Sequence, residues 1–265
     1  MRRTVVSAVT IGALLLAGCG GDEASELAPD AQETDTEPEA QEEETEPEAA
    51  DEPEPASDDP AAHTSIYQEG VEPALDTVDG EVTVAAMAAM DDSGSFPMII
   101  HNGTDQAISR VEVSGAAVDA DGTTVSSGSS QGFEPNLIEP GGIAIGYVYA
   151  GFDLPANLTL DQVIVDYTTG VGSFENIFAV DATEVSVSTE RVTGTISNPH
   201  DVEVSGPISV GMACLDDSGT LMAVTGSFAD RDGMEAGGTS TFTLDSYGRE
   251  MNCAGLILAA SGFEA

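Results

Sequence analysis

The chain contains no lysine and no tryptophan, and its only basic residues are six arginines against 48 acidic residues. At a formal net charge of −42, nothing in the sequence would neutralise phosphates, so nucleic acid is disfavoured as a partner. Direct docking of a folded domain onto anionic lipid is disfavoured for the same reason. Aromatic residues make up only 5% of the chain, so neither a carbohydrate-stacking platform nor an aromatic-rich interface is expected.

Long apolar runs are also absent, apart from residues 5–17 near the N-terminus. This run follows two arginines and has the length of a signal-peptide core, short of the roughly 20 residues that a membrane-spanning helix needs. Residues 16–19 read Leu-Ala-Gly-Cys and resemble the lipobox of bacterial lipoproteins without departure. The resemblance implies cleavage before Cys19, a diacylglyceryl group on its sulfur and a location on the extracytoplasmic face of the cell membrane. The alternative is an ordinary secretory signal with an incidental cysteine.

Residues 20–62 consist mainly of Glu, Asp, Pro, Ala, Thr and Gln, with 18 acidic residues and no basic one. Such a composition does not bury enough apolar surface to offset the entropy of ordering, so it predicts a disordered segment. Like charges and Glu-Pro pairs extend it, which suits a spacer; an acidic ligand-binding tail is the alternative. Beyond residue 62 the chain still carries 30 acidic residues against four arginines. We therefore expect salt or divalent cations to stabilise the folded part.

Beyond residue 77 the sequence changes to short β-branched runs separated by Gly, Asn and Asp, which predicts an all-β fold. The expected strands are 81–86, 96–101, 111–118, 123–127, 143–149, 163–168, 184–188, 192–197, 208–215, 221–225, 240–244 and 255–260. Residues 84–90 are equally compatible with a short helix, because Ala and Met favour helix.

An internal repeat divides this region into two parts. Asn102 and Asn198, which each end an apolar strand, are 96 residues apart. Asp119 and Asp216 begin matching segments at an offset of 97, and the glycine pairs 141–142 and 237–238 match at 96. Two units of just under 100 residues have the size of immunoglobulin-like sandwiches. The expected organisation is a signal peptide (1–18), the lipidated cysteine with an acidic linker (19–77) and two β-sandwich modules (78–181 and 182–265).

The segments VSGAAVDADGTTV and VGMACLDDSGTLM, followed by IEPGG and MEAGG, resemble the FxLYD-type sandwich modules of bacterial envelope proteins. The resemblance covers roughly residues 80–265 and implies tandem β-sandwiches. The family's aromatic residue is missing before both aspartates, where Val118 and Leu215 stand, and Ala236 replaces a proline in the second copy.

With Cys19 assigned to lipid, Cys214 and Cys253 remain, both in the second module. An extracytoplasmic location permits a disulfide between them, as an inter-strand bridge. Closing a loop of about 40 residues would stabilise the fold by roughly 3–4 kcal/mol. Two buried free thiols are the alternative.

Several motifs suggest chemistry, each with a simpler interpretation. Asp119-Ala120-Asp121-Gly122 begins like a calcium loop but lacks the later ligands, and Asp-Gly between strands is the commonest hairpin turn. Asp216, Asp217 and Ser218 repeat the pattern. Residues 128–132 match G-x-S-x-G, but we expect them in a loop of an all-β unit rather than at a nucleophile elbow. The spacing of His63, His101 and His200 does not indicate a zinc site.

No catalytic constellation, cofactor site or metal site is therefore expected. The sequence favours a lipid-anchored envelope protein with non-enzymatic binding modules, for an unidentified protein or cell-wall partner. A module that responds to calcium or salt is the first alternative, and an envelope hydrolase the second.

Overall fold

The structure is a computed structural model that describes residues 66–170, 177–179, 181–245 and 252–264, all within the compact unit Ser57–Ala265. These residues form β-strands and no helix, which confirms the all-β prediction. The strands are β1 (Ile66–Gly70), β2 (Val82–Met87), β3 (Ser95–Asn102), β4 (Ile108–Val118), β5 (Thr124–Glu134), β6 (Leu137–Ile138), β7 (Ile143–Tyr149), β8 (Thr159–Thr169), β9 (Ile177–Ala179), β10 (Asp181–Val187), β11 (Arg191–Ser197), β12 (Val204–Leu215), β13 (Leu221–Phe228), β14 (Gly233–Met234), β15 (Thr239–Asp245) and β16 (Gly255–Glu264). The segment 84–90 is therefore strand and irregular chain rather than helix.

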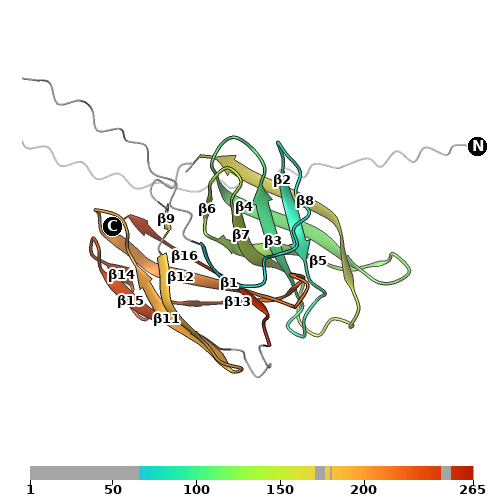
Figure 1. Ribbon diagram of the computed structural model, residues 1–265. Coiled ribbons are helices and arrows are strands. Elements are labelled where there is room, and N and C mark those ends of the chain that lie inside the picture. Colours follow the sequence, from blue (N-terminus) through green and yellow to red (C-terminus); the bar gives the residue numbers. More distant parts are fainter. Residues whose placement is uncertain (1–65, 171–176, 180, 246–251, 265) are drawn as a thin grey trace, which may run out of the picture. The chain divides into compact units, whose positions relative to one another are not determined.

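The described strands form three antiparallel sheets (Figure 1). The N-terminal sheet has the order β2-β3-β7-β5-β4-β6, with β8 also paired to β4. The central sheet has the order β1-β16-β12-β13, with β14 on β12 and β9 on β16. The three-stranded sheet has the order β10-β11-β15.

The strand pairing repeats along the chain. In the N-terminal repeat (β2–β8), β3 lies between β2 and β7, and β4 pairs with β5, β6 and β8. In the C-terminal repeat (β10–β16), β11 lies between β10 and β15, and β12 pairs with β13, β14 and β16. Each strand of one repeat thus has a counterpart in the other, as the sequence landmarks indicate.

The repeated asparagines make matching hydrogen bonds at the same point of each repeat. The buried amide of Asn102 donates to the carbonyls of Gln106 and Ile138, at 2.8 and 2.9 Å. Asn198 is buried in the same way and donates to the carbonyls of Val202 and Met234, at 2.7 and 3.2 Å. Each asparagine therefore ties the end of its strand to two later segments of its own repeat.

The described residues form three hydrophobic cores, two of which lie between sheets. The first lies within the N-terminal sheet and contains Phe96, Met98 and Phe133. The second lies between the central and three-stranded sheets and contains Met212 and Phe242. The third lies between the opposite face of the central sheet and the N-terminal sheet; its members are Ile99, Ile145, Ala213, Leu215, Leu221, Ile257 and Ala259.

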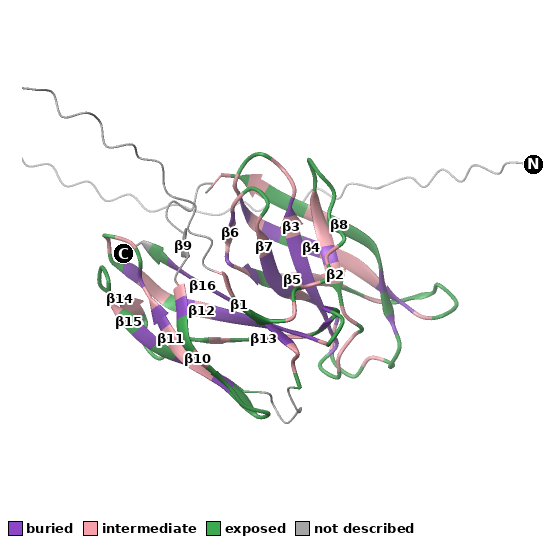
Figure 2. Ribbon diagram, viewed as in Figure 1, coloured by how far each residue is buried: buried purple, intermediate pink, exposed green. Residues whose placement is uncertain are grey.

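The middle strands of the central sheet, β12 and β16, are consequently buried on both faces. Along β16, Leu256 and Leu258 belong to the second core, whereas the intervening Ile257 belongs to the third. Residues 255–262 are all buried, and Figure 2 shows buried colour along β12 and β16. Such double burial requires the near-continuous apolar runs found in these two strands.

Two strands contradict the expected domain boundaries. Residues 66–70, assigned to the linker, form β1, which pairs with β16 from Ile66↔Ala259 to Gly70↔Gly255. Residues 177–179, assigned to the first module, form β9, which also pairs with β16. The linker prediction to residue 77 and the module boundary at 181/182 are therefore wrong at these segments. The signal peptide, Cys19 and His63 lie outside the described residues.

Replacing Asn102 with alanine should destabilise the fold, because the substitution leaves the carbonyls of Gln106 and Ile138 without their amide donor. Unsatisfied buried groups cost about 1–3 kcal/mol each, so we expect a loss of about 2–4 kcal/mol in the free energy of unfolding, measured by urea denaturation. Gln106→Ala is the matched control, since that side chain is exposed and should change stability by less than about 0.5 kcal/mol. Equal losses in the two variants would contradict the structural role of Asn102.

Candidate functional site

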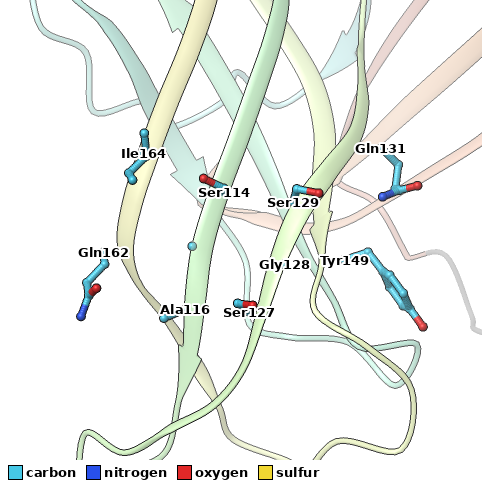
Figure 3. A pocket seen from close by; sticks show the side chains of 10 residues that line it. Ser114, Ala116, Ser127, Gly128, Ser129, Gln131, Tyr149, Gln162 and Ile164 are labelled. Carbon is cyan, nitrogen blue, oxygen red and sulfur yellow. The ribbon is translucent and has the colours of Figure 1, made fainter. Parts of the chain in front are cut away.

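A shallow depression of about 590 Å³ lies on the outer face of the N-terminal sheet and crosses four neighbouring strands (Figure 3). Its floor is made of small residues of β4 and β5, and its margins carry larger side chains of β7 and β8. The lining residues are Ser114, Gly115, Ala116, Ser127, Gly128, Ser129, Gln131, Tyr149, Gln162 and Ile164. None of them is charged, although the chain as a whole is strongly acidic.

The course of β5 explains the shape of this surface. Residues 124–129 of β5 pair with β4, and residues 129–134 pair with β7. Gly128 lies at this change of partner, where a Cβ atom would come within 2.3 Å of the Tyr149 carbonyl oxygen. Glycine is therefore needed for the close approach, and the small side chains around it leave the floor low.

Tyr149 forms one margin of the depression. Its ring meets the ring of Phe152 edge to face, with centroids 5.2 Å apart, and Phe152 itself is 80% exposed. The Tyr149 hydroxyl is buried and has no hydrogen-bond partner among the described residues. Burial, followed by the negative charge of Asp153, raises the pKa of Tyr149, so the phenol stays protonated.

The depression has the chemistry of a surface for uncharged polar groups. Serine hydroxyls and glutamine amides supply both donors and acceptors, and none of the lining side chains ionises near neutral pH. Figure 3 places Gln162 and Ile164 on β8 at one margin and Gln131 and Tyr149 at the other. This arrangement can form hydrogen bonds with an uncharged polar ligand.

The G-x-S-x-G motif lies in strand β5 rather than in the expected loop, and Gly128, Ser129 and Gln131, but not the central Ser130, line the depression. Residues 128–132 are part of the strand β5, and the hydroxyl of Ser130 accepts a hydrogen bond from the Val113 backbone at 3.0 Å. A nucleophile elbow needs a turn between strand and helix, which this segment does not form. The central serine of the motif therefore supports the backbone.

His101 and His200 lie at the repeated asparagine turns rather than in the depression. His101 is at the end of β3, and the His200 backbone N–H donates to the Asn198 side chain at 3.0 Å. Within the described ranges, no three His, Cys, Asp or Glu side chains are grouped so as to hold a metal ion.

The two aspartate motifs form matching turns. One carboxylate oxygen of Asp119 accepts hydrogen bonds from the backbone N–H groups of Asp121 and Thr123, at 3.0 and 2.9 Å. Asp216 does the same with Ser218 and Thr220, at 2.8 and 3.0 Å. The Ser218 hydroxyl and these two N–H groups hold the pKa of Asp216 below its usual value. Both carboxylates thus stabilise hairpin turns.

A carboxyl group that sequence analysis did not identify lies between the two repeats. Glu134, at the end of β5, accepts hydrogen bonds from the hydroxyls of Ser209 in β12 and Ser261 in β16. The Asn136 side chain donates to the Ser261 hydroxyl at 3.3 Å. Burial raises the pKa of Glu134 to about 7, and the two hydroxyl hydrogen bonds oppose this rise. The partners are 75 and 127 residues away in sequence, so no local pattern indicates the contact.

A disulfide bond joins Cys214 and Cys253, the pair expected from the sequence, with Cα atoms 5.2 Å apart. Cys214 is buried in β12, and Cys253 comes shortly before β16. The Ala254 N–H also donates to the Leu215 carbonyl at 2.8 Å. The bridge therefore fixes the start of β16 against the end of β12, away from the depression.

Comparison with known proteins adds no family assignment. No protein-family model matches the sequence, and no curated protein matches it significantly.

The partly buried carboxyl of Glu134 predicts a pH dependence of stability. The pKa of Glu134 is higher in the folded protein (about 7) than in the unfolded chain (4.5), so protonation of Glu134 favours the folded state. Its contribution to the free energy of unfolding is complete below pH 4.5. That contribution is lost as the pH rises towards and through 7. A shift of this size corresponds to about 3 kcal/mol.

Glu134→Gln keeps the shape of the side chain but removes its charge. We therefore expect the free energy of unfolding of the variant to rise by about 3 kcal/mol relative to that of the parent as the pH increases from 4.5 to 8. Urea denaturation at each pH measures this difference. Glu81→Gln, at an exposed position, is the matched control. A stability difference between Glu134→Gln and the parent that stays constant with pH would contradict the assignment.

Proposed function

We propose that this protein is a lipid-anchored component of the bacterial cell envelope that presents non-enzymatic β-sandwich binding modules on the extracytoplasmic face of the membrane. The observation that carries the proposal is the Leu-Ala-Gly-Cys sequence at 16–19, directly after an apolar run of signal-peptide length. Two acyl chains on Cys19 are enough for durable attachment, whereas one chain binds only marginally.

The acidic segment after Cys19 supports the same role. Residues 22–62 carry 18 acidic residues and no basic one, and such a segment is extended by its own charge. Negative charge also directs it away from an anionic membrane surface. The segment serves as a spacer between the anchor and the all-β unit.

The depression on the N-terminal sheet is the surface we assign to binding. Its uncharged lining of hydroxyls and amides, with Tyr149 at the margin, suits recognition by hydrogen bonds. The motif serine Ser130 accepts a hydrogen bond from the Val113 backbone N–H.

Cys19→Ser should release the protein from the membrane, because serine has no sulfur to receive the lipid. We expect the parent in the detergent phase after Triton X-114 partition of cells, and the variant in the aqueous phase or the medium. Mass spectrometry of the parent should find a lipid-modified peptide that begins at Cys19.

Ser25→Ala, in the adjoining spacer, is the matched control and should partition like the parent. A Cys19→Ser protein that still partitions into detergent, or an unmodified Cys19 in the mature parent, would overturn the anchor.

A further inference from the structure

We propose that the outer edge of β8 binds an extended basic segment of a partner protein, which adds to the N-terminal sheet as a further antiparallel strand. The inference rests on the proposed binding function and specifies the kind of partner. Its first support is the internal repeat, in which β8 and β16 are equivalent strands: β8 pairs with β4, and β16 pairs with β12.

The outer edge of β16 is occupied by strands from outside the C-terminal repeat. Strand β1 pairs with residues 255–259 of β16, and β9 pairs with residues 261–263. Both added strands are antiparallel to β16. This fold therefore uses the position beside β16 to hold an additional strand.

The equivalent edge of β8 has no such strand within the described ranges, where β8 pairs with β4 alone. Several apolar side chains of β8 are exposed to solvent: Ile164 is 57% exposed, Tyr167 45% and Val163 37%. Figure 2 shows β8 largely in the colour of exposed residues, in contrast to the buried β16. An open edge with exposed apolar side chains is the geometry that accepts an added strand.

The negative charge of β4 and β8 favours a basic partner segment at this edge. Of the charged residues on β4 and β8, three are acidic, and Arg110 is the single basic one. Two of the acids, Glu112 and Asp166, lie directly opposite each other in the ladder, and like charges in such a pair are destabilising. Lysine or arginine on an added strand would lie beside Asp161 and Asp166, the two acids of β8 itself, and neutralise them. A second copy of this acidic chain would instead add to the repulsion.

The pattern of β1 indicates how an added strand packs. Ile66 contacts the third core and the next residue, Tyr67, contacts the second core, so successive side chains of β1 reach opposite faces of the central sheet. A strand on β8 would similarly place one side chain towards Val165, which packs on the first core, and the next towards Ile164 beside the depression. The partner segment is therefore basic, extended and partly apolar.

Hydrogen–deuterium exchange of the full chain tests the proposal with three synthetic peptides of equal length. The first alternates Lys and Val, the second alternates Glu and Val, and the third alternates Lys and Pro. The Lys-Val peptide should slow amide exchange in β8. The Lys-Pro peptide carries the same charge but lacks half of the backbone N–H donors, so it should not slow exchange in β8. The Glu-Val peptide is negatively charged and should also leave exchange in β8 unchanged.

Ile164→Lys should weaken binding of the Lys-Val peptide at least about tenfold, because it places a positive charge on the edge that a basic strand approaches. Phe228→Lys is the matched control: it adds the same charge at an exposed position of β13 and should leave affinity within about twofold. Thermal melts of both variants verify that they fold.

Three results would overturn the proposal: equal protection by the Lys-Pro peptide, protection outside β8, or no protection by any peptide. A concentration-dependent dimer that Ile164→Lys abolishes would assign the edge to a second copy instead. Failure of these tests leaves the anchor at Cys19 unaffected, since that is measured by membrane partition and mass spectrometry.

Discussion

Burial of β12 and β16, the middle strands of the central sheet, on both faces is the constraint on which the rest of the structure depends. One face packs on the three-stranded sheet and the other on the N-terminal sheet. The third core uses alanines as well as larger side chains, and Gly211 lies close to Glu134 and Ile145, where a Cβ atom would be 3.3–3.4 Å from either side chain. Each fully buried aliphatic side chain contributes about 1.5–3 kcal/mol to the stability of the fold. The third core therefore makes each repeat stabilise the other, in contrast to two independent domains.

Much of this architecture could be predicted from the sequence, because its strands carry strong local signals. The alternation in β10 and the β-branched runs of β3 and β7 indicate strands, and the Asn and Asp-Gly turns mark the repeat. The continuous apolar run GLILAA in β16 also indicates burial on both faces, and hence a third layer, once it is compared with the mixed sequence of its counterpart β8.

Other features have no local signal. Strands β1 and β9 are only five and three residues long, and nothing in their own sequences indicates that both pair with the distant strand β16. Burial of Glu134 depends on two serines from distant strands, and in a chain with 48 acidic residues nothing distinguishes this one. The depression is formed by a change of strand partner within β5, which composition does not reveal.

The pairing of β1 with β16 also has a consequence for how the protein is made. Ile66 is one of the first described residues to leave the ribosome, yet its partner Ala259 is among the last. The central sheet therefore closes only after β16 has been synthesised, whereas the contacts of the N-terminal sheet lie within β2–β8 and are available earlier. Pairings of such long separation form slowly, because the chain must first pay the entropy of closing a very large loop. The first and last strands of the described all-β unit therefore meet last as the protein folds.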